Sequence, residues 1–423
     1  MTVLLLVFAG TLMVGVLISG LAHRSIVSTA LLFLVVGFLA GSGVTGVLRL
    51  DPYSPLVIHF AELALFSVLF TDGMHAGVRD LRSAWRLPGR ALLFGMPLTF
   101  AGGALLCRLL TGLSWPESML VAAVLTPTDP VFAEALVGRK EVPRRLRHLL
   151  NVESGLNDGL ALPVVLVLIS LVSARSTSGL LVLGELGLGI ALGVVVPYLA
   201  LTIEALPGFR AHGRYQPLNA FSIGLLVLAL CYVTHANPFL AAFAAGSTVA
   251  SVSPAARASF EGFGELVAEL FKLAALLIFG ALLSPALLGR LPLSAYLLAV
   301  LLLILVRPAA LSLSLLGSSL DRREWVAAAW FGPKGFASVT YGLLVLQSGA
   351  ARAGRMFDII AVTTALSIVA HSSTDLTITR WFHDERVDPP RPLRRILGGG
   401  SGPTEVGRVV RRSALRRVGR FRD

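Results

Sequence analysis

Two stretches of this chain place carboxylates in the middle of apolar segments that are long enough to cross a lipid bilayer. Residues 126–130 read TPTDP and contain Asp129, and residues 151–159 read NVESGLNDG and contain Glu153 and Asp158. An ionised side chain at the centre of a bilayer costs roughly 3 kcal/mol or more on insertion scales, so it persists where it has a partner or a function. The two stretches therefore predict a buried polar site inside a helical membrane protein.

The composition supports a chain with many membrane spans. Of its 423 residues, 55% are hydrophobic and 14% are charged, whereas soluble domains carry about 25% charged residues. The net charge of +12 would suggest a nucleic-acid partner in a soluble protein. Here Lys and Arg gather in predicted loops and in the C-terminal tail, as membrane topology and contact with anionic lipids require. We therefore expect no nucleic-acid partner.

A spanning helix needs about 20 mostly apolar residues, and thirteen segments of the chain are candidates. If the N-terminus is outside, most of the 36 Lys and Arg residues fall on the inner side, together with the C-terminus. The candidate segments lie near residues 3–22, 26–45, 54–74, 90–110, 115–136, 148–173, 179–205, 217–234, 236–253, 266–288, 292–317, 324–349 and 355–381.

Thirteen segments divide into two groups of six and one connector. We predict an all-α transmembrane domain over residues 1–383, with repeats at 1–173 and 217–383, connector helix 179–205, and a basic cytoplasmic tail at 384–423. A single connecting helix inverts the second repeat, and inverted repeats built around broken helices are typical of secondary transporters. The fifth and twelfth segments correspond in this scheme, and each has prolines beside a charge at mid-span.

The fifth segment is predicted to break at its prolines. Pro127 and Pro130 have no N–H, so each leaves a carbonyl of the preceding turn without its helical donor. Such carbonyls are tolerated at membrane depth where they line a water-filled cavity. With the Thr128 hydroxyl and the Asp129 carboxylate they form a set of hard oxygens suited to a small monovalent cation. The alternative is a simple kink in which Asp129 bonds to neighbouring backbone.

The sixth segment presents its polar residues on one face. At 100° per residue, Glu153, Ser154, Asn157 and Asp158 fall within one side of the helix. If this side faces Asp129, two carboxylates approach one site. A carboxylate there binds either a proton or a cation, and such competition is the minimum requirement for exchange.

Buried acids require positive partners. Arg307 either pairs with Glu153 or extends to the inner membrane face, and Lys334 in the broken twelfth segment compensates the C-terminal dipole of a half-helix. Lys272 is expected at the membrane interface. Asp72, near the cytoplasmic end of the third segment, is expected to attract cations.

Taken together, these motifs resemble those of monovalent cation/proton antiporters of the NhaP and sodium/hydrogen exchanger type. The matching elements recur in order across residues 1–383: TPTDP at 126–130, ESGLNDG at 153–159, RP at 307–308 and FGPKG at 331–335. The resemblance implies a homodimer in which each protomer has a mobile core domain and a scaffold.

The resemblance also assigns roles to individual residues. It implies that Asp158 alternates between a proton and a cation, that Asp129, Ser154 and a carbonyl near Thr128 complete the coordination of the cation, and that Asn157 supports Asp158. It further implies a Glu153–Arg307 ion pair. An Asn-Asp sequence, found here at 157–158, goes with electroneutral one-for-one exchange in such proteins. Many relatives have arginine where this chain has Lys334.

We therefore expect a multi-pass cell-membrane transporter that exchanges Na⁺, with K⁺ or Li⁺ as alternatives, for protons by alternating access in pH homeostasis. It is not expected to be an enzyme or to need a cofactor beyond the transported cation. Two other functions fit the acids alone: a cation channel, although channels favour symmetric filters, and an intramembrane aspartyl hydrolase using Asp129 and Asp158 as an acid pair.

Overall fold

The computed structural model describes residues 2–22, 28–75, 87–129, 142–173, 179–209 and 213–387. Within these ranges the chain is helical, apart from loops and an isolated bridge between Gly41 and Leu48, so the predicted all-α class is confirmed. Residues 1–384 form one compact unit. Three predicted features lie outside the described residues: Pro130 with the end of the fifth segment, much of the basic loop sequence, and the tail from residue 388.

The first half of the chain contains eight α-helices and one π-helical turn among its described residues. These are α1 (Thr2–Ala22), α2 (Thr29–Ala40), α3 (Pro55–His75), α5 (Leu87–Arg90), η1 (Ala91–Gly95), α6 (Met96–Thr111), α7 (Trp115–Leu125), α9 (Arg144–Val172) and α10 (Gly179–Glu204).

The second half contains nine α-helices, one 3-10 turn and one π-helical turn among its described residues. Its elements are η3 (Gly213–Tyr215), α11 (Gln216–Thr234), α12 (Pro238–Val252), α13 (Pro254–Leu282), α14 (Pro285–Arg290), α15 (Leu293–Leu301), η4 (Leu302–Val306), α16 (Arg307–Ser314), α17 (Arg322–Trp330), α18 (Phe336–Gln347) and α19 (Ala353–Val387).

Each of the thirteen predicted segments contains a described helix, but they differ in length. Seven helical stretches are long and apolar enough to cross a membrane by length and composition, and five other apolar helices of 10–17 residues are shorter. The number of spans therefore stays a prediction.

One predicted boundary was wrong. Helix α13 begins at Pro254, well before the predicted segment 266–288, because the Ser253 side chain caps it by accepting the Ala256 N–H. Because its first turns carry charged residues, hydropathy did not predict that these turns belong to the membrane helix.

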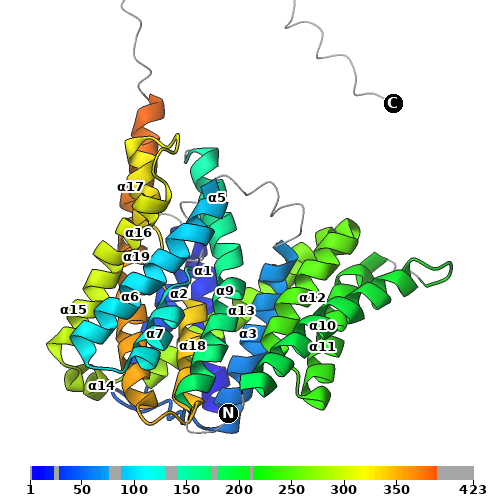
Figure 1. Ribbon diagram of the computed structural model, residues 1–423, viewed down its shortest axis with the longest axis horizontal. Helices are drawn as coiled ribbons and strands as arrows, with labels where there is room; N and C mark the ends of the chain where they lie inside the picture. The colour runs from blue at the N-terminus through cyan, green and yellow to red at the C-terminus, as the bar shows by residue number, and fades with distance from the viewer. Residues whose placement is uncertain are drawn as a thin grey trace, which may run out of the picture. The chain divides into compact units, whose positions relative to one another are not determined.

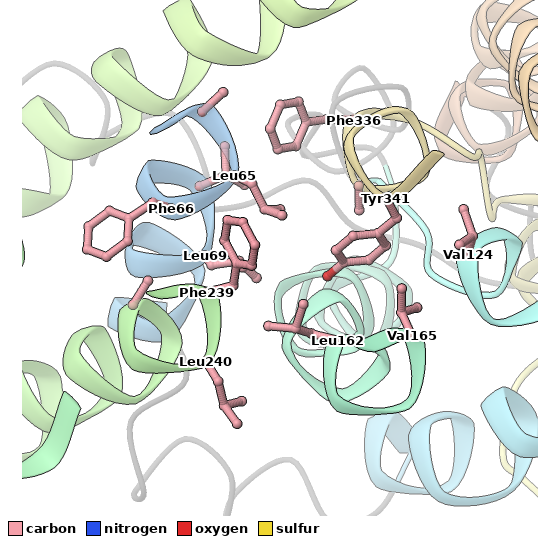
Figure 2. Close-up of a cluster of buried hydrophobic side chains, with 14 of the residues drawn as sticks. Leu65, Phe66, Leu69, Val124, Leu162, Val165, Phe239, Leu240, Phe336 and Tyr341 are labelled. Atoms are coloured by element: carbon pink, nitrogen blue, oxygen red, sulfur yellow. The ribbon is translucent and has the colours of Figure 1, made fainter. Parts of the chain in front are cut away.

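The helices are arranged in two groups around a shared apolar core (Figure 1). Helices α10, α11 and α12 lie on one side, and α5 to α7 lie with α15 to α17 on the other. The buried cluster between them joins Leu65 and Leu69 of α3 and Phe239 of α12 to Leu162 of α9 and Tyr341 of α18 (Figure 2). This cluster therefore joins α3 and α12 to α9 and α18.

Close backbone contacts hold α3 against α12. A Cβ atom at Gly246 would collide with the backbone carbonyl of Phe70, and one at Gly73 would collide with that of Phe243. The same kind of contact joins α2 to α13 at Gly37 and Gly280. Small residues allow helices in membranes to pack at short distance, where dispersion contacts and polar backbone contacts provide the attraction.

This packing predicts that Gly246→Ala lowers the stability of the protein. The added methyl group forces α3 and α12 apart, and overpacking of this kind typically costs about 1–3 kcal/mol. The effect is measured as the thermal midpoint of the purified protein in detergent. The midpoint is determined by size-exclusion chromatography of heated samples. Gly262→Ala is the matched control, because Gly262 lies within α13 with open space around its Cβ position. Equal thermal midpoints for the two variants would contradict the proposed close contact.

Candidate functional site

The site is built on two interrupted helical segments that begin in the same way. Helix α7 starts with a capping box in which the Ser114 backbone N–H and hydroxyl donate to Glu117 Oε2 at 2.7 and 2.6 Å. Helix α17 starts with the equivalent box of Asp321 and Glu324. Each helix ends shortly before a proline, and residues 126–129 and 331–335 are non-helical. The predicted break in the twelfth segment is therefore confirmed, and the helix of the fifth segment ends before Pro127 as predicted, while Pro130 lies outside the described residues.

The two breaks compensate each other's helix dipoles. The Phe336 N–H, at the start of α18, donates to Asp129 Oδ2 at 2.8 Å. The Lys334 ammonium donates to the carbonyls of Thr126 and Pro127, at the end of α7, at 3.1 and 3.3 Å. A carboxylate thus lies at a positive helix end and an ammonium lies at a negative one, which are the favourable placements for both charges.

Backbone contacts fix the two breaks against one another. The Asp129 N–H donates to the Pro333 carbonyl at 2.9 Å, and the Ser338 hydroxyl donates to the Val124 carbonyl at 2.9 Å. Gly335 lies against the Asp129 side chain with no space for a Cβ atom. The alternative of a simple proline kink does not describe this region, because the partners of the freed backbone come from a distant part of the chain.

Arg307 and Glu153 form a buried ion pair. Arg307 Nη2 lies 2.9 Å from Glu153 Oε1, and both side chains are only 6% exposed. The same nitrogen donates to the Phe331 carbonyl at 3.0 Å, at the end of α17. The guanidinium therefore compensates both the acid and the C-terminal end of a half-helix, and it does not extend to the membrane surface.

The polar face of α9 lies against the break after α7. Asn157 Nδ2 donates to the Thr128 hydroxyl at 2.6 Å and to its carbonyl at 3.2 Å, and the hydroxyls of Thr128 and Ser154 lie 3.3 Å apart. Asp158 is buried beside them, and its carbonyl accepts a hydrogen bond from the Tyr341 hydroxyl at 2.9 Å. Among the described residues its carboxylate atom Oδ1 is buried without a hydrogen-bond partner, as are Asn157 Oδ1 and Glu153 Oε2.

These groups fit a small monovalent cation. The carboxylate of Asp158, the hydroxyls of Thr128 and Ser154 and the amide oxygen of Asn157 are all hard oxygen donors close to one break. A buried carboxylate oxygen without a donor is costly unless a ligand or proton satisfies it. The donor set is thus suited to an ion that enters and leaves.

Two further charged residues from the sequence analysis lie on neighbouring helices. Asp72 is half-buried near the C-terminal end of α3, and Lys272 is half-buried within α13, one turn from the buried residues Ala268 and Leu276. The predicted interfacial position of Lys272 and the predicted role of Asp72 in attracting cations stay predictions.

Half-helices cross inside a bundle of apolar helices, and their buried charges compensate each other. This arrangement defines an integral membrane transporter of the antiporter fold. The family model described as sodium/hydrogen exchanger, transmembrane, matches residues 9–380. The chain therefore belongs to the sodium/hydrogen exchanger family, and exchange of cations for protons is favoured over the channel and hydrolase alternatives.

Individual relatives and solved structures agree with this assignment. The chain is 27% identical over 389 residues to a K⁺/H⁺ antiporter NhaP2 from Shewanella sp. (strain ANA-3), covering 90% of this chain and 67% of the relative. It is 24% identical over 390 residues to a K⁺/H⁺ antiporter NhaP from Alkalimonas amylolytica, with coverage of 90% and 67%. The sodium proton antiporter MjNhaP1 from Methanocaldococcus jannaschii has the same fold, with a TM-score of 0.72, 17% identity, and coverage of 88% of this chain and 97% of that one.

The Glu153–Arg307 ion pair predicts that the effects of replacing the two residues on stability are strongly coupled. Replacing Arg307 by Gln leaves a buried carboxylate without its cation, and breaking a buried pair in this way typically costs about 3–5 kcal/mol. We expect Arg307→Gln to lower the thermal midpoint in detergent, and the double variant Glu153→Gln with Arg307→Gln to recover part of the loss. Additive effects of the two single changes would show that the pair contributes no coupling energy.

Proposed function

We propose that this protein exchanges a monovalent cation for protons across the membrane by alternating access, with Asp158 as the carboxylate that carries either species. The observation that supports this most directly is the unpartnered Asp158 Oδ1, buried beside the hydroxyls of Thr128 and Ser154 and the amide of Asn157. The similar proteins, which are named as K⁺/H⁺ and sodium proton antiporters, support the same function.

The exchange follows from competition at one carboxylate. A cation bound by Asp158 and the neighbouring hydroxyl, amide and carbonyl oxygens neutralises the acid, and a proton on the carboxylate does the same. Asp158 is therefore neutralised in either loaded form, and a neutralised acid moves past an apolar barrier at far lower cost than a charged one. Asp129 serves the same site as a second ligand while its Oδ2 holds the start of α18.

The residues around Asp158 favour one-for-one exchange. Asn157 occupies the position before Asp158 on α9 and donates its amide to Thr128, so the residue preceding the exchanging acid is not ionisable. The Lys334 ammonium is engaged with the carbonyls at the end of α7, which gives it a structural role. One proton then replaces one monovalent cation, and no net charge crosses the membrane.

We further infer that the chain contains two inverted repeats, which meet where their interrupted helices cross. The spacing from Glu117 to Glu324 equals the spacing from Arg145 to Arg352. Arg352 Nη2 lies 2.7 Å from Glu117 Oε2, and Arg145 Nη2 lies 2.5 Å from Glu324 Oε2. Each repeat thus supplies the arginine that binds the capping glutamate of the other.

The larger assembly and the identity of the ion are also part of the proposal. A homodimer in the cell membrane, with its N-terminus outside and its C-terminus in the cytoplasm, agrees with the distribution of basic residues. The helices that carry the crossing, α7, α9, α17 and α18, form the moving core, and α3 and α10 to α13 form the scaffold. Na⁺, K⁺ and Li⁺ all suit an oxygen-lined site, and Na⁺ is the first candidate.

We expect Asp158→Asn to abolish exchange while leaving the protein folded, because an amide binds neither a proton nor a cation in exchange. Purified protein in liposomes containing a pH-sensitive dye is given Na⁺, K⁺ or Li⁺, and dissipation of a preset pH gradient is recorded. Asp51→Asn is the control, since Asp51 is exposed in a loop and asparagine retains the oxygen that accepts the Tyr53 N–H. Cation-dependent dissipation by Asp158→Asn would refute the assignment of the site.

One-for-one exchange predicts a rate that is independent of membrane potential. Each elementary charge moved across 100 mV changes the free energy by about 2.3 kcal/mol, so an electrogenic cycle responds strongly. Imposing an inside-negative or inside-positive potential on the same liposomes, with equal ion gradients, should leave the initial rate of wild-type exchange unchanged. A rate that follows the sign of the potential would show unequal stoichiometry.

Competition at Asp158 predicts that the apparent KM for the cation rises as pH falls, because protons and cations bind the same carboxylate. Initial rates measured at several cation concentrations and at stepwise lower pH test this. Maximal rates at saturating cation should change much less than the apparent KM over the same range. A KM that does not vary with pH, with only the maximal rate changing, would contradict a shared binding group.

A further inference from the structure

The break between α17 and α18 has two backbone groups that are bound by α19 and not by the other break. The Trp330 carbonyl, at the end of α17, lies 3.1 Å from His371 Nε2, and the Lys334 N–H donates to the Ser367 hydroxyl at 2.8 Å. Ser367 and His371 lie one turn apart on α19, and both are buried. One short stretch of α19 therefore binds both ends of the break.

The His371 ring is held at both nitrogens and on one face. A carbonyl oxygen accepts hydrogen bonds and donates none, so we assign a hydrogen to Nε2, which donates to the Trp330 carbonyl. Nδ1 lies 2.8 Å from the Ser367 carbonyl and 3.2 Å from the Ser367 hydroxyl. The Trp330 indole stacks on the imidazole with ring centroids 5.0 Å apart, and its Nε1 donates to the Thr374 hydroxyl at 3.0 Å. These contacts fix the end of α17 on α19.

The residues of this break in turn hold groups of the proposed cation site. The Lys334 ammonium donates to the two carbonyls immediately before Thr128, and the Phe336 N–H donates to Asp129 Oδ2. A shift of residues 330–335 relative to α19 would therefore move both a hydroxyl ligand and a carboxylate ligand. A binding site keeps its affinity only where supporting hydrogen bonds hold its groups within about 0.5 Å of the productive geometry.

We propose that Ser367 and His371, which together form the α19 bridge, are positioning residues for cation binding. They fix the break after α17 so that Thr128 and Asp129 are placed to bind the cation. Neither side chain of the bridge needs to touch the ion, because each acts through the backbone of the break. This inference rests on the proposed exchange function and adds two residues to it.

The test measures the apparent KM for Na⁺, K⁺ and Li⁺ in liposomes for three variants. Ser367→Ala removes the acceptor of the Lys334 N–H, and His371→Leu removes the donor to the Trp330 carbonyl, so each leaves a buried backbone group without its partner. Each change should raise the KM by roughly tenfold, which corresponds to about 1.4 kcal/mol, while the maximal rate at saturating cation falls much less. His371→Gln should recover most of the affinity, because its side-chain amide again offers an N–H to the carbonyl.

Ser372→Ala is the matched control. Ser372 is buried on the same helix, next to His371, and its hydroxyl lies 3.1 Å from that of Ser28, which caps α2. The change removes a side-chain contact of α19 with a different part of the protein. The KM of this variant should equal that of wild-type protein.

A purely structural role for the α19 bridge gives a different result. The thermal midpoint in detergent would then fall in Ser367→Ala and His371→Leu, but the KM of the folded protein would match wild type, and this would overturn the proposal. A KM in His371→Gln as high as in His371→Leu would overturn the role of the histidine hydrogen bond. If His371→Leu does not fold, the smaller change Ser367→Ala provides the same measurement. Failure of the exchange function itself is recognised separately, because wild-type protein would then show no cation-dependent exchange that Asp158→Asn abolishes.

Discussion

The crossing of two interrupted helices is the constraint on which the rest of this structure depends. Backbone groups freed inside a membrane need partners, since no water is available within the hydrocarbon region. Here the freed backbone groups of each break are bound by groups of the other break. The N–H of Asp129 binds the carbonyl of Pro333, and the side chains of Asp129 and Lys334 bind the exposed ends of α18 and α7. Neither broken segment is satisfied alone, so the crossing forms as one unit.

The charges at the crossing explain why polar residues are tolerated so deep in an apolar bundle. Glu153 is matched by Arg307, which also binds the Phe331 carbonyl, and Asp129 is matched by the start of α18. Like Glu153 Oε2, Asp158 Oδ1 is buried without a hydrogen-bond partner among the described residues, but the structure shows no ion pair there for Asp158, whereas Glu153 has Arg307. The surroundings of Asp158 are fixed by bonds among Asn157, Thr128 and Ser154.

The two groups of helices differ in how they are packed, and this difference suits motion between them. Glycines bring the backbones of α3 and α12 into direct contact, which makes a stiff unit. Between this unit and the helices of the crossing the contact is made by apolar side chains, such as Leu65 and Phe239 against Leu162 and Tyr341 (Figure 2). Side-chain contacts without hydrogen bonds slide at lower cost than interlocked backbones, as alternating access requires.

The sequence by itself determined the helical membrane class, the two breaks and the polar face of α9. Each of these follows from local rules: apolar length, the missing N–H of proline, and the 100° rotation per residue that places Glu153, Ser154, Asn157 and Asp158 on one side. The start of α13 was harder to predict, because its charged first turns did not look like part of a membrane helix.

Only the tertiary structure decided which backbone groups Lys334 and Asp129 bind and which end of a half-helix Arg307 compensates. These contacts join residues far apart in the chain. Their geometry depends on how whole helices cross, and no local pattern encodes a crossing.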